Sequence, residues 1–254
     1  MANQDDKLRA EGKPDVLKSA LEMYGPLCSI SGSEEASQLR DLCRNGDPFP
    51  LIAYQWPSLL IDESDPDAEF FDGEPGSLTN PCMRLDRWQR DEIIAPFFDD
   101  SIYEICVKGC TGPGKGAAVA ICTNLWFDVF DPSKTVLTSS DFNHAKRNIY
   151  AEVVKWRKLM REPAAGRTLT HEIKDTDQHY VVVSNPASGE GFSGAHSPYT
   201  LFVIDESSSI PGARYLDACK QGRKIAIIGN PRVVSGWFFR LWEPWRCCGS
   251  AAAL

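Results

Sequence analysis

The first candidate for chemistry is a short glycine-rich segment that ends in a lysine. It consists of Gly109, Cys110, Thr111, Gly112, Pro113, Gly114 and Lys115, and Gly116 and Ala117 follow directly. In such a loop, glycines let successive backbone N–H groups point at phosphate oxygens, and the start of a following helix adds its positive end. The lysine contributes a mobile positive charge at the β- and γ-phosphates. The segment has the GxxxxGK spacing of a Walker A motif and predicts that these nine residues bind ATP.

The residue after Lys115 departs from the usual pattern. A serine or threonine at that position offers a hydroxyl to Mg²⁺, whereas this chain has Gly116. Because Mg²⁺ keeps several waters in protein sites, we expect water to take the coordination position. Thr111 would serve instead only if the loop were rearranged. An ordinary glycine turn is the alternative interpretation of the whole segment.

The second candidate is a pair of adjacent carboxylates, Asp205 and Glu206, which ends the apolar run 201–205 and resembles a Walker B motif. An aspartate at a strand tip can hold Mg²⁺, and a neighbouring glutamate can orient and deprotonate the water that attacks a γ-phosphate. Parallel sheets bind their ligands at the carboxyl ends of their strands. We therefore expect Asp205 to be a metal ligand and Glu206 to be catalytic, together with Lys115. Carboxylates that cap a turn are the alternative.

The elements that must position these residues alternate between strands and helices from residue 84 onward. Apolar runs predict strands at 101–108, 135–138, 180–184, 201–205 and 224–229. The sequence predicts one helix before them, at 85–95, and two helices between them, at 117–130 and 143–160. Continuous apolar strands are typical of a parallel sheet that helices cover on both faces. The expected fold is therefore a doubly wound α/β core.

The rest of the chain carries no sharp motif. Residues 1–83 are expected to form an accessory or lid segment, with short helices at 14–24 and 33–43 and an exposed loop at 62–81. The ATPase core is expected to span residues 84–246. Residues 249–254 resemble translated cloning sites, and we therefore expect the chain to be cut from a longer protein.

Composition excludes several classes of protein. The chain has 254 residues, 43% hydrophobic residues and a net charge of −8. No apolar run approaches the ~20 residues that span a bilayer, and the start is polar, so we expect a cytoplasmic protein without a membrane partner. The acidic balance is unlike that of a passive polyanion binder. The nine cysteines form no CxxC pair and the four histidines show no metal-ligand spacing, so we expect reduced thiols and no zinc site.

With both motifs in place, residues from roughly 84 to 240 resemble the ATPase domain of the large terminase subunit, the DNA-packaging motor of tailed bacteriophages. The likeness is carried by LDRWQ at 85–89, the phosphate loop, GEGFSGAH at 189–196 followed by LFVIDESSSIP at 201–211, and IIGNP at 227–231. In this family, Gln89 would read the adenine edge, since an amide both donates and accepts. Asn230 would sense the γ-phosphate.

The resemblance implies a P-loop NTPase with a RecA-like core of the additional-strand, catalytic-glutamate type, which uses ATP and Mg²⁺. It further implies a ring of copies, expected to be a pentamer, on the portal protein of a procapsid. Double-stranded DNA would occupy the channel, and the small terminase subunit would be a further partner. Such a protein works in the host bacterial cytoplasm and transiently at the portal. The chain leaves no room for the family's nuclease domain, so no nuclease activity is expected.

The resemblance also implies an arginine finger from a neighbouring copy, which would stabilise charge in the transition state. Arg147 is the first candidate, followed by Arg161 and Arg167, and a solvated surface arginine is the alternative for each. Two rival functions stay open. One is a superfamily 2 helicase-like ATPase, although the chain has no room for a second RecA-like domain after residue 240. The other is a nucleotide-binding assembly module with little turnover.

Overall fold

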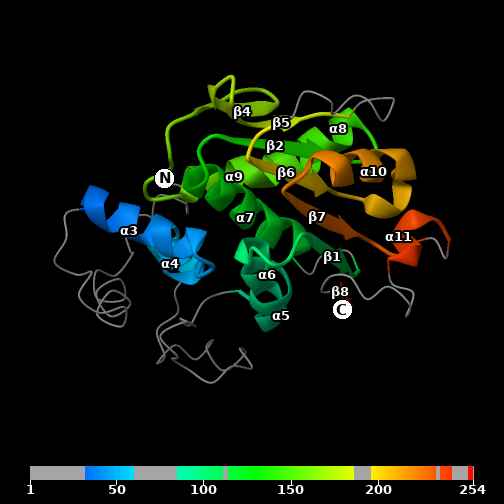
Figure 1. Cartoon of the computed structure of the whole chain (residues 1–254), viewed down its shortest axis with the longest axis horizontal. Coiled ribbons are helices and arrows are strands. Elements are labelled where there is room, and N and C mark those ends of the chain that lie inside the picture. Colours follow the sequence, from blue (N-terminus) through cyan, green and yellow to red (C-terminus); the bar gives the residue numbers. More distant parts are fainter. Residues whose placement is uncertain are drawn as a thin grey trace, which may run out of the picture.

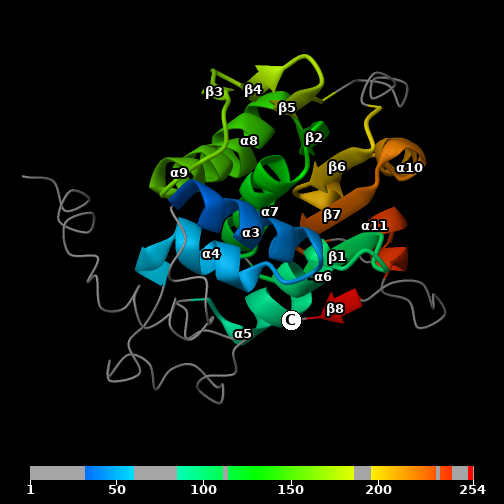
Figure 2. The same cartoon turned by 60° about the vertical axis from the view of Figure 1, so that its left-hand side comes forward.

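The structure, a computed structural model, describes residues 32–59, 85–110, 114–185, 196–232, 235–241 and 251–253. It is an α/β fold with one mostly parallel, mixed sheet flanked by helices (Figures 1 and 2). The helix expected at 14–24, the loop expected at 62–81 and most of the 189–196 motif lie outside the described residues. So do Thr111, Gly112 and Pro113 of the phosphate loop.

The strands of the sheet lie in the order β3-β4-β5-β2-β6-β7-β1-β8. Their bounds are β1 Glu104–Lys108, β2 Ser133–Thr138, β3 Arg167–Thr168, β4 Glu172–Thr176, β5 His179–Val183, β6 Tyr199–Ile204, β7 Lys224–Gly229 and β8 Ala251–Ala253. The strands from β5 to β8 pair in parallel, and β3, β4 and β5 pair antiparallel. All five expected strands are present. The β3–β4 pair was not expected, and neither was β8, which pairs with β1 and lies within the segment 249–254 that resembled translated cloning sites.

The helices occupy the segments that the sequence pattern indicates, with three additions. Their bounds are α3 Gly32–Arg44, α4 Phe49–Gln55, η2 Pro57–Leu59, α5 Arg87–Gln89, η4 Arg90–Ile94, α6 Ala95–Phe98, α7 Lys115–Val129, α8 Phe142–Ala145, η5 Lys146–Tyr150, α9 Ala151–Leu159, η7 Ser207–Ser209, α10 Gly212–Gln221 and α11 Trp237–Arg240. The three added α-helices are α4, α10 and α11, and the short 3₁₀ helices η2 and η7 were not expected either. The helices expected at 85–95 and 143–160 each contain a π-helical turn, η4 and η5 respectively.

Both faces of the parallel strands are buried, which confirms the expected layering. Side chains alternate along a strand, so successive residues must enter different cores. In β7, Ala226 and Ile228 join a cluster with α7, whereas Ile225 and Ile227 join a second cluster with α10 and α11. The continuous apolar runs in the sequence reflect this two-sided burial.

Helix α7 is buried around almost its whole circumference, as expected for a helix that is apolar on all sides. It packs against α3 and α9 and against the sheet (Figure 2). Near its end, Asp128 accepts hydrogen bonds from Gln55 Nε2 at 3.1 Å and from the Ala164 backbone N–H at 2.7 Å. Burial raises the pKa of Asp128. The hydrogen bond from the Ala164 N–H and the charges of Arg40 and Arg157 oppose this rise. This network joins α3 and α4 to the far end of the helix that begins at Lys115.

Two further observations concern expectations from composition. Cys43, Cys106 and Cys122 are buried free thiols, and Cys110 is an exposed free thiol. Among the helices of the described ranges, we find none whose length and apolar character would let it cross a bilayer.

Candidate functional site

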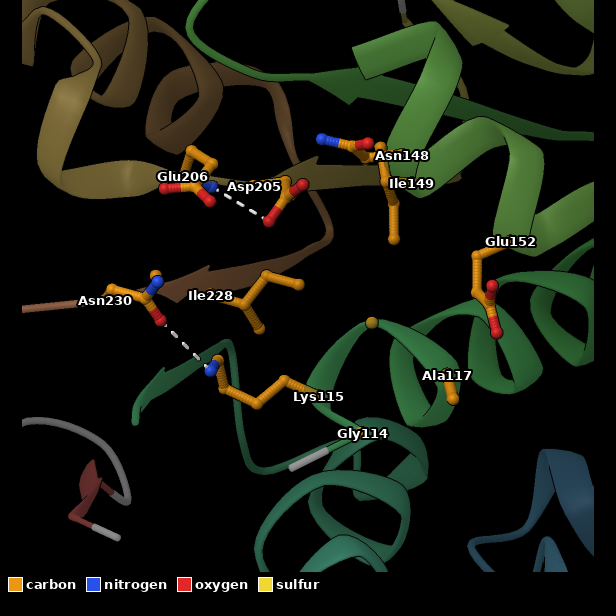
Figure 3. A pocket seen from close by; sticks show the side chains of 12 residues that line it. Gly114, Lys115, Ala117, Asn148, Ile149, Glu152, Asp205, Glu206, Ile228 and Asn230 are labelled. Carbon is orange, nitrogen blue, oxygen red and sulfur yellow. Dashed lines mark hydrogen bonds between the residues drawn. The ribbon is translucent and has the colours of Figure 1, made fainter. Parts of the chain in front are cut away.

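A cavity of about 510 Å³ lies at the carboxyl ends of β6 and β7, beside the start of α7. Its lining consists of Gly114, Lys115, Gly116, Ala117, Asn148, Ile149, Glu152, Asp205, Glu206, Ile228, Gly229 and Asn230. Figure 3 shows Asp205 and Glu206 on one side of this space, with Lys115 and Asn230 facing them. Four residues that the sequence singled out separately therefore share one cavity.

Lys115 is the first residue of α7 and is only 8% exposed. Its Nζ donates hydrogen bonds to the carbonyl oxygens of Gly109 at 3.0 Å and Cys110 at 2.6 Å, and to Asn230 Oδ1 at 3.3 Å. Burial lowers the pKa of Lys115, and nearby negative charge, including that of Asp205, opposes this shift. The ammonium group is thus held against the loop backbone at the edge of the cavity.

Asp205 directly follows β6, and its backbone N–H donates to the Thr138 carbonyl at 2.9 Å. Its Oδ1 accepts a hydrogen bond from the Glu206 backbone N–H at 2.9 Å. Burial raises the pKa of Asp205 from 3.8 to about 6, although this N–H and the charges of His144 and Lys115 oppose the rise. A carboxylate that has lost water in this way gains stability when a cation approaches it.

Glu206 has a backbone conformation that is uncommon for a residue with a side chain. Its φ of 52° and ψ of 42° lie in the left-handed region, where such residues are strained. The next residue holds this turn in place, because Ser207 Oγ donates to the carbonyls of Ile204 at 2.9 Å and Ile228 at 2.8 Å. Glu206 Oε2 is buried and has no hydrogen-bond partner within the described part of the chain. Glu206 therefore brings to the cavity both a strained backbone and a carboxylate oxygen without a hydrogen-bond partner in the described residues.

Gly114 forms the turn between the phosphate loop and α7. Its φ is +87°, a conformation that glycine adopts without strain. A Cβ atom added there would lie 2.4 Å from Gln89 Nε2, so a larger residue would have to displace this amide. Gln89 itself is 7% exposed and does not line the cavity. The structure therefore places this expected adenine reader against the backbone of the loop.

Gly116, which stands in place of the usual hydroxyl residue, faces open space. A Cβ atom added to it would meet no heavy atom within 4 Å. Both Gly116 and Ala117 line the cavity from the first turn of α7. The absence of a side chain at position 116 is therefore not forced by crowding.

The sequence analysis missed the wall formed by η5 and α9, which contributes Asn148, Ile149 and Glu152. Asn148 Nδ2 is hydrogen-bonded to His144 Nε2 at 2.6 Å. Glu152 Oε1 accepts from Lys155 Nζ at 2.9 Å and from Trp156 Nε1 at 3.0 Å. The polar residues 148 and 152 are four positions apart, which is a signal for one helical face. The π turn that directs this face to the cavity leaves no comparable trace in the sequence.

The arginines proposed for a neighbouring copy lie elsewhere on the surface. Arg147 is exposed on η5 and does not line the cavity of its own chain. Arg161 is exposed, with its guanidinium 4.9 Å from the centre of the Tyr54 ring, and Arg167 is exposed in β3. The described residues thus supply no arginine to the cavity lining.

The donor set of the cavity limits how a cation can be held. The described residues contain no group of three or more His, Cys, Asp or Glu side chains placed to hold a metal ion. Asp205 and the unsatisfied Oε2 of Glu206 are nevertheless oxygen donors of the kind that Mg²⁺ prefers. The residues fit a cation that takes its remaining ligands from phosphate and water.

Neither comparison with known proteins assigns a function to this cavity. No protein-family model matches the chain, and a search of curated proteins gives no significant match.

Proposed function

We propose that the chain is a P-loop ATPase with a RecA-like core, and that the cavity binds ATP together with Mg²⁺. One observation carries this proposal: the lysine of the glycine-rich loop after β1 and the Asp-Glu pair after β6, two parallel strands separated by β7, line the same cavity. The two motifs lie far apart in the sequence, and neither pattern alone predicts that they meet. Their meeting at the carboxyl ends of the strands supports a phosphate site.

The phosphates would be bound by the positive end of α7 and by Lys115. In the free chain, Lys115 Nζ is satisfied by the carbonyls of Gly109 and Cys110. On ATP binding, this ammonium exchanges carbonyl contacts for β- and γ-phosphate oxygens, which carry full negative charge and form stronger hydrogen bonds. Asn230, whose Oδ1 already contacts Lys115 at 3.3 Å, is placed to respond to that exchange.

Hydrolysis would use Glu206 as the general base. Its carboxylate accepts a proton from water as the water oxygen bonds to the γ-phosphorus, and the bond from this phosphorus to the β–γ bridging oxygen breaks. ADP and inorganic phosphate are the products. When bound, Mg²⁺ would neutralise charge on the phosphate oxygens, with Asp205 holding it directly or through water. The strained backbone at Glu206 keeps the base oriented before the substrate arrives.

The wider proposal follows the resemblance to the large terminase subunit. In that role, ATP hydrolysis powers the movement of double-stranded viral DNA into a procapsid, within a ring of copies on the portal protein. The small terminase subunit would be a further partner, and the host cytoplasm would be the site of action. A neighbouring copy would supply the arginine finger that the cavity lacks within the described residues.

The decisive experiment measures phosphate release by the purified chain and by Glu206→Gln, at several protein concentrations. We expect turnover to fall by on the order of 100-fold or more, because general bases contribute at least that factor, with ATP affinity changed less than about threefold. Glu152→Gln is the matched control. Glu152 lines the same cavity, but its Oε1 is occupied by Lys155 and Trp156, so turnover should stay within a few-fold of wild type.

A second candidate function is a nucleotide-binding assembly module with little turnover. The glycine at position 116, which removes a hydroxyl from the metal site, specifically favours it. Equal ATP binding by wild type and Glu206→Gln, with no turnover in either at any protein concentration, would establish this second candidate. Failure of the wild-type chain to bind any nucleoside triphosphate would rule out both functions.

A further inference from the structure

The side chain of Gln89 connects two parts of the molecule that are far apart in the sequence. Its Oε1 accepts a hydrogen bond from the Asp86 backbone N–H at 3.0 Å, and its Nε2 donates to the Gly114 carbonyl at 3.1 Å. Both halves of the amide therefore have partners. The first bond belongs to a capping box that starts α5, and the second reaches the end of the phosphate loop.

The contact with Gly114 bears directly on the orientation of Lys115. The Gly114 carbonyl also accepts the Ala118 N–H at 3.1 Å, which is the first hydrogen bond of α7. Gln89 thus holds the peptide group that immediately precedes Lys115, at the turn where the loop becomes a helix. The fit is tight, because a Cβ atom on Gly114 would lie 2.4 Å from Gln89 Nε2.

Reading a base would require this amide to leave its partners. An adenine edge is recognised by one donor and one acceptor, and Gln89 uses one of each within the chain. Releasing the Gly114 carbonyl would remove one of its two donors at a place where Gln89 is only 7% exposed. The cavity lining among the described residues contains no aromatic side chain and does not include Gln89. Its polar groups instead suit phosphates and a cation.

We propose that Gln89 is a positioning residue for the phosphate loop, which acts on the triphosphate group of the ligand through the Gly114 carbonyl. This inference rests on the proposed function. It predicts that loss of the Gly114 contact weakens the binding of ATP, GTP, CTP and inorganic tripolyphosphate by the same factor.

Two substitutions distinguish the effects of the two hydrogen bonds that the Gln89 side chain forms. Gln89→Glu keeps an acceptor for the Asp86 N–H, since glutamate is a normal capping-box residue, but its carboxylate cannot donate to Gly114. Gln89→Met keeps the approximate shape and removes both bonds. Asp91→Asn is the surface control on the same helical segment, because Asp91 is exposed and pairs only with Arg87 in the described contacts. Denaturation midpoints for all variants show whether each one folds.

The experiment measures Kd for ATP, GTP, CTP and tripolyphosphate by calorimetry, together with KM and kcat for each nucleotide. We expect Gln89→Glu and Gln89→Met to weaken all ligands by the same factor, roughly tenfold for the loss of a hydrogen bond that orients the loop. The ratio of ATP to GTP affinity stays that of wild type. Relative to wild type at the same pH, Gln89→Glu recovers affinity as the pH falls to about 5, because a protonated carboxyl can donate to Gly114 again.

Three results would overturn the inference. Wild-type preference for ATP over GTP of about 30-fold or more, lost in Gln89→Glu, would show that Gln89 reads the base. Wild-type affinities in a folded Gln89→Glu protein would show that the Gly114 contact does not position the loop. If the wild-type chain binds neither nucleotides nor tripolyphosphate, the proposed function itself fails and the inference fails with it. The first two results leave the proposed function intact.

Discussion

Lys115 and Lys224 are chemically identical side chains that lie near opposite ends of strand β7, and each donates three hydrogen bonds. Lys224 begins the strand and donates to the backbone carbonyls of Pro96 at 3.3 Å, Asp99 at 2.7 Å and Ile102. Lys115 donates to two loop carbonyls and to Asn230 Oδ1 just beyond the other end of β7. Both are almost completely buried: Lys224 is 3% exposed and Lys115 is 8% exposed.

The difference between the two lysines lies in what surrounds them. Burial lowers the pKa of Lys224 to about 8, with the charges of Asp100 and Asp99 opposing the shift, so it is still an ammonium group at neutral pH. Its partners are main-chain carbonyls of α6 and of the segment between α6 and β1, and it does not line the cavity. Lys115 instead borders a cavity that also contains two carboxylates. Burial and hydrogen-bond number therefore do not separate the two lysines, whereas contact with the cavity does.

The largest effect on this comparison should come from replacing each lysine with methionine. Lys224→Met leaves one buried and two partly buried carbonyls without their donor, which we expect to lower the free energy of unfolding by about 3 kcal/mol. Lys115→Met should lower it by less, about 1–2 kcal/mol, because Cys110 is exposed, so its carbonyl can bond to water, and only the Gly109 contact is buried. Urea denaturation with an unchanged m-value measures both.

For nucleotide binding, the Lys115 substitution should have the larger effect and the Lys224 substitution the smaller one. Lys115→Met should lose measurable ATP binding, while a folded Lys224→Met protein should bind ATP with nearly wild-type affinity. Equal loss of stability in the two variants would show that the two lysines serve the fold alike and would remove the basis of the comparison.

A smaller effect should appear in the pH dependence of stability, through the carboxylate that faces Lys115. The pKa of Asp205 is raised from 3.8 to about 6, so between these values the folded state binds a proton that the unfolded state has lost. Stability therefore falls as the pH rises through this window. Asp205→Asn removes the effect. Its stability relative to wild type should increase between pH 4 and pH 6.5, by on the order of 1–2 kcal/mol because the group faces a water-accessible cavity.

The measurement is a series of urea denaturation curves at fixed ionic strength. Because Asp99, Asp100 and the other carboxylates are present in both proteins, their contributions cancel in the difference. A difference that stays constant from pH 4 to pH 6.5 would mean that Asp205 is not desolvated, and it would weaken the contrast with the opposite end of β7.

The smallest effect should come from adding a side chain at Gly116, where nothing lies within 4 Å of a new Cβ atom. Gly116→Ser supplies a hydroxyl next to Lys115 and should increase Mg²⁺-dependent ATP affinity on the order of threefold to tenfold. Gly116→Ala is the control and should only stabilise α7, by about 0.5–1 kcal/mol. Mg²⁺ titrations of nucleotide binding compare the two. Weaker Mg²⁺ dependence in the serine variant would show that position 116 points away from the metal.

Much of the fold was predictable because apolar strands and strand-end motifs leave strong local patterns. The run 224–229 matches β7 residue for residue, and the helix expected at 117–130 is α7, which begins two residues earlier. The short antiparallel pair β3–β4 was missed because Arg167–Thr168 is exposed and lacks an apolar pattern. The π turns η4 and η5 were missed because both insert one residue into helices whose amphipathic spacing otherwise continues.

The site was predictable at its strand ends and less so in its contacts. Lys115, Asp205, Glu206 and Asn230 share the cavity because parallel strands end at the same edge. The role expected for Gln89 depended on which group its amide contacts. The sequence pattern does not show that this amide lies within hydrogen-bond distance of the Gly114 carbonyl. The wall with Asn148 and Glu152 depends on a helix register that a π turn shifts.

The left-handed backbone at Glu206 has a consequence for protein engineering. Glycine adopts this conformation without strain, so a library screened only for thermal resistance should enrich glycine at position 206. The same screen would discard the carboxylate on which the proposed chemistry depends. A stabilised variant of this chain would therefore keep the proposed activity only if the selection also requires turnover.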